Sequence, residues 1–424
     1  MHSKARSHSS MFGMSWSQAN AALAIMLTLV LLMLVITVTA QPADAQTFQV
    51  IHNFSGQGDG SIPLTGLTID TSGKLYGTTG AGAAGHGTVF LLNHAGSAWL
   101  VNTLYAFAGG NDGSSPGGRV SIARDGTLYG ATEFGGGCDS NGCGTVYRLV
   151  PPASPPRTAQ YRWTETVLYR FNYSVGRIPS GDITFDHSGN IYGTTQQGGT
   201  NGDGVVYELS PSPGGWTETT LYAPADDNGA QGPEGGVVFD NSGNLYGVLN
   251  SYSPAGAVFQ LSPTGSGWTT QILHVFSGSD GANPGVGLII DPSGNLYGAT
   301  QGEGSGGGGT VFALTPTQGG WTFNTLYSFQ GEGPPYGPLY QLMMDSAGNL
   351  YGTTYLSGAY GYGSVFKLTP DNGSWTHTSL HDFTGGSDGR YPVSNVIIDA
   401  HGNLYGTAAQ GGAYGVGVIW EISP

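Results

Sequence analysis

One short phrase, Leu/Ile-Tyr-Gly, recurs seven times along this chain of 424 residues. Its tyrosines are Tyr76, Tyr129, Tyr192, Tyr246, Tyr297, Tyr351 and Tyr405. Five of the six intervals are 51 to 54 residues long, and a Pro-rich insertion lengthens the second interval to 63 residues. A fixed period of this length indicates a repeat architecture, in which each unit completes its core against its neighbours.

Each repeat has the pattern of a four-stranded antiparallel sheet. In the unit that spans residues 284–329, the expected strands are 287–290, 296–300, 309–314 and 321–329. The segment Asp291–Asn295 contains Asp, Pro, Ser and Gly, the residues of a tight hairpin turn. Four such strands in about 50 residues are typical of a propeller blade, and residues 46–424 have no helical periodicity.

The order of the strands predicts a closed ring. The third strand occurs seven times, but the fourth strand follows its own third strand only six times, beginning near Trp99, Trp163, Trp216, Trp268, Trp321 and Trp375. The missing fourth strand is found at the front, where residues 47–54 alternate in the same way. We therefore expect an all-β fold, a seven-bladed β-propeller whose N-terminal strand completes the last blade.

The first 45 residues are expected to be a signal peptide. Lys4 and Arg6 precede an uncharged apolar run over residues 21–40, and Ala43-Asp44-Ala45 has the form of a cleavage site. Cleavage after Ala45 would leave residues 46–424 as one domain of seven repeats, secreted or periplasmic and free of the membrane. The alternatives are cleavage after Ala40, or retention of the apolar run as an anchor.

Composition excludes some partners. The net charge is −15, which argues against nucleic acid and anionic membrane surfaces. Only 9% of residues are charged, against about a quarter in a typical globular protein. The 75 glycines recur at fixed offsets between apolar strands, so they are interpreted as turn and packing residues.

We expect the protein to be a monomer.

Two cysteines, Cys138 and Cys143, flank an Asn-Gly turn. In an exported chain this pair predicts a small disulfide-bonded loop. A metal pair is the alternative, although no His or further Cys stands beside them.

The repeated phrases resemble a known family. Gly348–Thr354 (Gly-Asn-Leu-Tyr-Gly-Thr-Thr), the Gly-Thr-Val-Phe of the third strand and the Gly-Trp…Leu-Tyr-Ser-Phe of the fourth resemble the Gloeo/Verruco repeat of the choice-of-anchor tandem-repeat proteins. The resemblance covers residues 47–424 and implies export and a repeat fold. It implies no particular activity.

Two sets of aspartates recur with the repeat. The hairpin set is Asp70, Asp125, Asp186, Asp240, Asp291, Asp345 and Asp399. The second set precedes Gly in the loop that leaves the fourth strand and consists of Asp59, Asp112, Asp280 and Asp388. Both are interpreted as turn residues, and no cofactor is expected. Calcium at the second set is the alternative, because acidic Gly-rich loops can supply oxygen ligands.

Three histidines share one repeat position with tyrosines. His52, His274 and His381 stand two residues before the phenylalanine that closes the fourth strand. Tyrosine fills this position in four other blades, so we expect packing rather than catalysis from these histidines.

The loops between strands two and three, and those that leave strand four, should emerge on one face of the ring. They carry aromatic residues that the repeat does not require: Phe134, Tyr252, Tyr355, Tyr360, Tyr362 and Tyr414. Exposed tyrosines offer flat apolar rings with a hydroxyl group, which suit sugars or protein partners. The alternative is that these rings pack over neighbouring loops.

These observations favour an exported, non-enzymatic propeller that binds an extracellular polysaccharide or surface protein through this loop face. One alternative is a polysaccharide lyase or hydrolase, for which the non-repeated acids Glu133, Glu234, Glu303 and Glu332 are candidates. The other alternative is a structural protein of the cell envelope.

Overall fold

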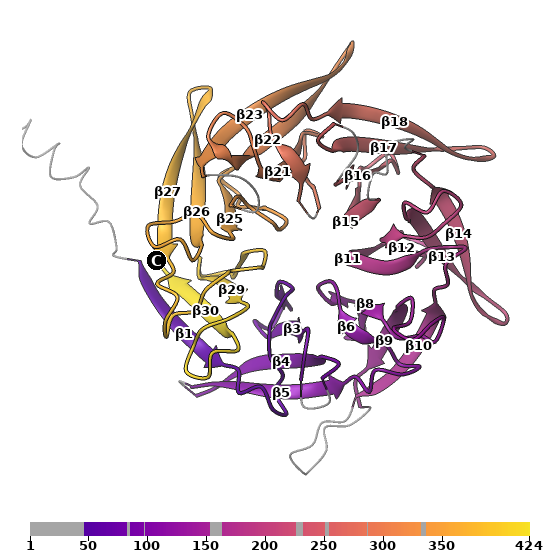
Figure 1. Ribbon diagram of the computed structural model, residues 1–424, viewed down its shortest axis with the longest axis horizontal. Helices are drawn as coiled ribbons and strands as arrows, with labels where there is room; N and C mark the ends of the chain where they lie inside the picture. Colours follow the sequence, from indigo (N-terminus) through magenta and orange to yellow (C-terminus); the bar gives the residue numbers. More distant parts are fainter. Residues whose placement is uncertain are drawn as a thin grey trace, which may run out of the picture. The chain divides into compact units, whose positions relative to one another are not determined.

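The computed structural model describes residues 46–82, 85–96, 98–152, 163–225, 232–250, 254–285, 287–331 and 336–424. Residues Thr47–Ser423 form one compact unit, a ring of seven antiparallel sheets (Figure 1). All regular elements in the described ranges are strands, which confirms the predicted seven-bladed propeller. The proposed signal peptide, residues 1–45, lies outside the described residues.

The blades follow the chain in order, with strand one nearest the centre and strand four at the rim (Figure 1). Blade one consists of β2 (Thr68–Ile69), β3 (Leu75–Thr79), β4 (Thr88–Ala95) and β5 (Ala98–Ala106). Blade two consists of β6 (Ser114–Pro116), β7 (Ser121–Ile122), β8 (Leu128–Phe134), β9 (Thr145–Val150) and β10 (Thr164–Arg170). Blade three consists of β11 (Arg177–Phe185), β12 (Ile191–Gln197), β13 (Val205–Ser212) and β14 (Gly215–Tyr222).

The second half of the ring repeats this plan. Blade four consists of β15 (Pro233–Phe239), β16 (Leu245–Leu249), β17 (Ala257–Thr264) and β18 (Gly267–Val275). Blade five consists of β19 (Ala282–Pro284), β20 (Ile289–Ile290), β21 (Leu296–Gly302), β22 (Gly307–Thr317) and β23 (Gly320–Gln330). Blade six consists of β24 (Met343–Met344), β25 (Leu350–Thr354), β26 (Ser364–Asp371) and β27 (Ser374–Asp382). Blade seven consists of β28 (Ile397–Ile398), β29 (Leu404–Ala408), β30 (Val418–Ser423) and β1 (Thr47–Asn53).

Blade seven closes the ring as predicted. β1 pairs antiparallel with β30, from Thr47 opposite Ser423 to Asn53 opposite Val418. Phe54, at the end of this strand, is fully buried and packs into blade one. The first residues of the described chain therefore hold its last strand in place.

The glycine of the recurrent phrase makes room for an aromatic ring. A Cβ atom on Gly77 would lie 2.5 Å from the ring tip of Phe90 on the neighbouring third strand. The same arrangement recurs in blade five, where a Cβ on Gly298 would lie 2.6 Å from Phe312. Any side chain at this position would displace a buried ring, which explains why glycine stands here in every blade.

The tyrosine of the phrase holds the hairpin turn. In blade four, Tyr246 Oη donates to Asp240 Oδ2 at 3.0 Å, and Asp240 Oδ1 accepts from two backbone N–H groups of its turn. The equivalent tyrosine–aspartate bond forms in six blades, with partners Asp70, Asp186, Asp240, Asp291, Asp345 and Asp399. These aspartates are turn residues, as expected.

Blade two departs from this pattern, and the equivalence expected for Asp125 was wrong. In blade one the Asp70 N–H donates to Lys74 O at 3.0 Å, and in blade two the equivalent bond runs from the Ala123 N–H to Thr127 O at 2.8 Å. Ala123 therefore occupies the position that aspartate holds in the other turns. Asp125 lies two residues later and accepts from Thr127 N instead. The sequence around Asp125 matches the turn by composition but not by register.

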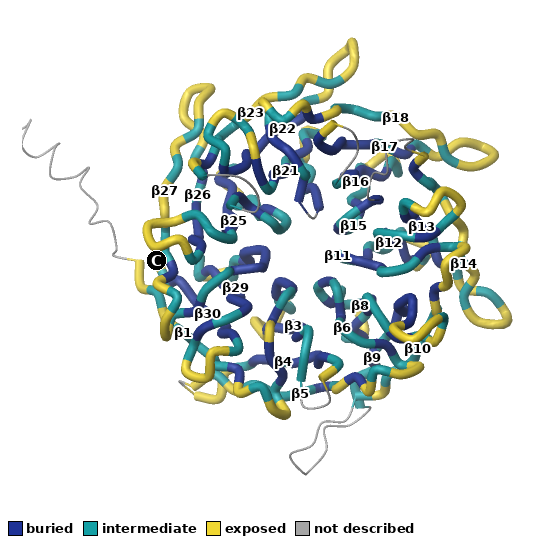
Figure 2. The backbone as a smooth tube through the Cα atoms, in the orientation of Figure 1, coloured by how far each residue is buried: buried dark blue, intermediate teal, exposed yellow. Residues whose placement is uncertain are grey.

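The hydrophobic core lies between blades rather than inside them. Val89 and Phe90 are neighbours on β4, yet Val89 packs toward blade two and Phe90 toward blade seven. Alternate residues of a strand point to opposite faces, so each sheet contributes to two clusters. Figure 2 shows exposed residues gathered at the outward-projecting turns between strands three and four.

Strand one is the least regular element. The expected strand over 287–290 is only Ile289–Ile290 in β20, with β19 as a separate short strand before it. In blades three and four, strand one is a single longer strand, β11 or β15. The two strands come close together at Gly236 of β15, where a Cβ atom would lie 2.4 Å from the main-chain oxygen of Asp182 in β11. Glycine permits this close contact.

Candidate ligand-binding face and central channel

The two kinds of loop do emerge on one face. In four blades the loop after strand two donates a backbone hydrogen bond to the loop that precedes its blade. The pairs are Gly136 N to Gly110 O, Gly199 N to Tyr173 O, Gly304 N to Gly278 O and Gly412 N to Gly386 O, at 2.8 to 3.0 Å. We call this surface the loop face.

The second set of aspartates closes the turns of this face. Asp280 accepts from the Ser277 N–H at 2.8 Å and bonds His274 Nε2 at 2.8 Å. Asp59 and Asp388 bond His52 and His381 in the same way, and Asp112 accepts from Tyr105 Oη. The carboxylates are thus engaged within their own turns, in four separate blades.

The histidines at this position pack as expected and also bond these aspartates. The His274 ring stacks on Phe323 with centroids 3.9 Å apart, and His381 stacks on Phe48 at 3.6 Å. Burial lowers the pKa of His381 although Asp388 acts in the opposite direction. In these four blades both His and Tyr reach the carboxylate from this position.

The tyrosines of blades six and seven are brought together in part. Tyr355 stacks on Tyr391 with centroids 4.9 Å apart, and Tyr362 lies 6.3 Å from Tyr391. The Arg390 guanidinium lies 5.3 Å from the Tyr391 ring. Sequence reasoning missed Tyr391 and Arg390, which precede a proline in the loop leading into blade seven. We call Tyr355, Tyr362, Tyr391 and Arg390 the seam cluster.

The other predicted aromatic residues are distributed differently. Tyr360 and Tyr414 are 61% and 65% exposed, the largest fractions among the exposed large hydrophobic residues of the described chain. Phe134 is half-buried at the end of β8, paired with Ser114. Tyr252 lies outside the described residues.

The backbone at Tyr391 belongs to a repeated device. Tyr391 has a φ of 57° and donates its N–H to Tyr362 O of the preceding blade at 2.9 Å. The same positive φ and inter-blade bond occur at the residue before proline in four more blades: Ile62, Ser115, Ile178 and Asn283. Such a backbone is costly for residues with a side chain, so it is held by its neighbours.

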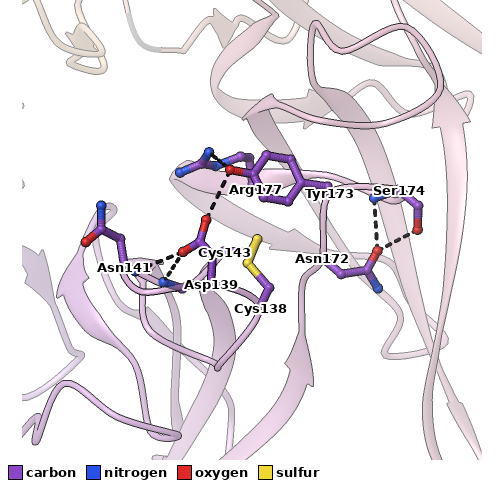
Figure 3. The surroundings of a disulfide bond; sticks show 9 residues. Cys138, Asp139, Asn141, Cys143, Asn172, Tyr173, Ser174 and Arg177 are labelled. Carbon is purple, nitrogen blue, oxygen red and sulfur yellow. Dashed lines mark hydrogen bonds between the residues drawn. A yellow bond between two sulfur atoms is a disulfide. The ribbon is translucent and has the colours of Figure 1, made fainter.

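A disulfide joins Cys138 and Cys143 in the loop of blade two, as predicted (Figure 3). Asp139 within this loop accepts a hydrogen bond from Tyr173 Oη of the next blade at 3.0 Å, and Arg177 donates to the same hydroxyl. These two cysteines and Asp139 form the group of potential metal ligands found among the described residues. Because both sulfurs are in the disulfide, the geometry does not favour the alternative of a cysteine metal site.

The charge of one non-repeated acid, Glu234, acts on another, Glu133. Burial, together with the charge of Glu234, raises the pKa of Glu133 to about 7. Burial also raises the pKa of Glu234, whose Oε1 accepts from Gln196 Nε2 at 3.2 Å. Glu303 lies in the loop of blade five, and Glu332 lies outside the described residues. Sequence reasoning identified both acids but not their proximity.

A cavity of about 410 Å³ lies on the axis of the ring. One position of the repeat lines it in every blade, immediately before a buried aliphatic residue: Gly66, Arg119, Asp182, Gly236, Gly287, Gln341 and Asn395. We call these seven residues the axial ring. Sequence reasoning missed the axial ring, although alignment of the repeats places its members at one position.

A polar brace crosses the axial ring. Arg119 donates from its backbone N–H to Asp182 Oδ1 at 2.8 Å and from Nε to Asp182 Oδ2 at 2.7 Å. Its guanidinium also donates to Gln341 Oε1, and Gln341 Nε2 donates to Leu288 O at 2.8 Å. Blades two, three, five and six are thereby connected through side chains at the axis.

The family model of the Gloeobacter/Verrucomicrobia repeat matches residues 36–254, 156–284 and 233–424. The chain therefore belongs to the Gloeobacter/Verrucomicrobia repeat family, and its described part is a seven-bladed propeller. A search of curated proteins found no match. No helix among the described residues is long and apolar enough to cross a membrane.

Solved structures share the fold at low sequence identity. The extracellular domain of a protein described as a one-component system from B. thetaiotaomicron superposes with a TM-score of 0.52 and 11% identity over 89% of this chain. This chain spans 40% of that structure's length. A protein described as an oxidoreductase (glucose dehydrogenase) from Thermus thermophilus gives a TM-score of 0.44 and 16% identity, over 79% of this chain and 99% of that one. The first likeness concerns the fold alone, and the second is too weak to support an argument.

Proposed function

We propose that this protein is an exported, non-enzymatic propeller that binds an extracellular polysaccharide through its loop face. The observation that carries the proposal is the seam cluster, together with the two most exposed tyrosines of the described chain, Tyr360 and Tyr414, in the loops of the same two blades. The hairpin turns of the opposite face are nearly identical from blade to blade. The loop face varies, and variable loops on a rigid scaffold are where binding usually occurs.

The chemistry of the seam suits a sugar chain. Tyrosine rings present flat apolar faces to the C–H faces of sugars, and their hydroxyl groups can bond to sugar hydroxyls. Arg390 adds guanidinium donors beside Tyr391. A surface protein is the second class of ligand that such a cluster would accept. The Cys138–Cys143 disulfide fits an oxidising compartment, as export requires.

Binding is tested with a glycan array on purified residues 46–424, with and without calcium. Replacing Tyr360 and Tyr414 together by alanine should weaken a bound glycan about tenfold or more, at about 0.5–1.5 kcal/mol for each stacked ring. Tyr360 and Tyr414 are chosen for substitution instead of Tyr362, because the Tyr362 ring packs against Gly385 and so contributes to the fold. A Cβ atom added to Gly385 would lie 2.8 Å from that ring.

Tyr173→Ala is the matched control, because Tyr173 is 52% exposed on the loop face of blade three, away from the seam. Binding that weakens equally in the control, or that is unchanged in the double variant, would place the site elsewhere. Calcium-dependent binding would favour a metal at the turn aspartates, with Asp388 nearest in sequence to the seam.

A polysaccharide-active enzyme is the second candidate, and the proximity of Glu133 and Glu234 favours it. Two carboxyl groups in distinct environments can divide the roles of acid and base, and burial raises the pKa of both Glu133 and Glu234. Release of new reducing ends or unsaturated products from a polysaccharide, abolished by Glu133→Gln, would support this candidate. Binding without turnover would support the first.

A further inference from the structure

We propose that the axial cavity is a second binding site, separate from the seam cluster, for one small neutral polyhydroxy molecule of the monosaccharide class. The cavity volume of about 410 Å³ lies at the lower end of the range of about 300–1,000 Å³ for small-molecule sites. The first argument is that the repeat does not dictate the residue types of the axial ring. The next residue of each repeat is always Leu, Val or Ile, whereas the axial ring holds three glycines and four different polar side chains.

The charged pair of the axial ring argues for a neutral ligand. Arg119 supplies the cation of the axial ring and Asp182 the anion, and the two are joined by hydrogen bonds. The pair is partly buried, with side-chain exposures of 25% and 27%. A charged ligand would have to compete with this internal pair and lose its own hydration, which is costly in a confined site.

The wall offers donors and acceptors in the mixture that a polyol uses. Asn395 is only 5% exposed, and its Oδ1 has no hydrogen-bond partner. Thr68 and Ser121 donate their hydroxyl protons to Val120 O and Ile183 O of the next blades, which leaves their oxygen lone pairs as acceptors. A buried amide oxygen without a hydrogen-bond donor is unfavourable, and a ligand hydroxyl group could donate to it.

Apolar groups complete the wall. Tyr340 lines the cavity together with Ile122, Val237 and Val238. These side chains can cover the C–H faces of a sugar while the polar groups bond its hydroxyls. Gly66 makes room for the Asn395 carboxamide in this wall, since a Cβ atom on Gly66 would lie 1.4 Å from Asn395 Oδ1.

The test uses purified residues 46–424 and four neutral probes: D-glucose, D-galactose, D-mannose and myo-inositol. Saturation-transfer NMR detects binding and calorimetry gives affinity, with glucuronate and glucosamine as charged counterparts. We expect at least one neutral probe to bind and both charged sugars to bind at least tenfold more weakly. Failure of all four to bind the folded protein, or equal binding of a charged sugar, would overturn the proposal.

Two variants locate the binding. Asn395→Leu removes the unpartnered oxygen with little change in volume and should weaken the bound probe at least tenfold. Tyr340→Leu removes the aromatic ring that would cover a sugar face, and it provides a second test if the first variant does not fold. Unchanged affinity in the folded variants would overturn the proposal. The Tyr360/Tyr414 double alanine variant should bind the small probe normally, so the two sites fail or succeed independently.

Discussion

Val50 lies directly opposite Trp420 in the sheet of blade seven, although the two residues stand near opposite ends of the chain. Phe48 on the same strand stacks on His381 of blade six with centroids 3.6 Å apart. β1 thus completes blade seven and also packs on its neighbour.

Deletion of residues 46–54 should therefore unfold or aggregate the protein. Half-buried Phe48 and Val50 and fully buried Phe54 would each forfeit up to about 1.5–3 kcal/mol, against a typical net stability of about 5–15 kcal/mol, and the edge of β30 would be exposed. Phe54→Ala alone should cost about 3–5 kcal/mol. A soluble deletion variant with the wild-type melting temperature would contradict ring closure by this strand.

The tyrosine–aspartate bond of the hairpins can be measured with a control inside the same protein. Tyr246→Phe removes the donor to Asp240 and should lower the free energy of unfolding by about 1 kcal/mol. Tyr129→Phe should have almost no effect, because Ala123 stands where the acceptor would be. Equal losses in urea denaturation would show that the hydroxyl acts through something other than this bond.

Glu133 should make stability depend on pH in a defined window. Its pKa rises from 4.5 to about 7 on folding, so the unfolded chain loses its proton first and the folded state is progressively destabilised between these values. Glu133→Gln should therefore melt like wild type at about pH 4 and a few degrees higher at pH 7 and above. Glu303→Gln provides the comparison. A difference that is constant with pH would contradict a titrating Glu133.

Export should yield a protein that begins at Gln46 and has no free thiol. Intact mass and thiol titration check both, and retention of residues 1–45 would contradict the cleavage. Replacing Cys138 and Cys143 by serine should lower stability by about 2 kcal/mol, because the bridge restricts the unfolded chain. Chemical reduction of the wild type should produce the same shift in melting temperature.

The repeat made the fold predictable to an unusual degree. The period, the Trp-led fourth strands and their displaced seventh copy were enough to predict the blades and the closing strand. Local pattern was less reliable where a turn keeps its composition but changes register, as at Asp125. It also could not reveal that strand one is short in some blades and continuous in β11, because glycine contacts between blades decide its length.

The candidate sites were harder to predict for a different reason. Phe134 and the tyrosines could be selected because they interrupt the repeat. Tyr391 meets Tyr355 and Tyr362 only through contacts between two blades. Arg119 and Gln341 meet across the axis from blades that are not neighbours. Such contacts depend on the curvature of the ring, which no local pattern encodes.

The pairing of Thr47 with Ser423 has a mechanical consequence. The first residue of β1 and the last residue of β30 lie opposite each other at the same end of the strand pair. A force that pulls the two ends of the chain apart therefore acts along the hydrogen bonds of this pair, which lie perpendicular to the strands. The load falls on the outermost bond first and then on each next bond in turn, as in a zipper. Tension between the ends should open the ring at this seam, at a force far below that needed to slide two strands past each other.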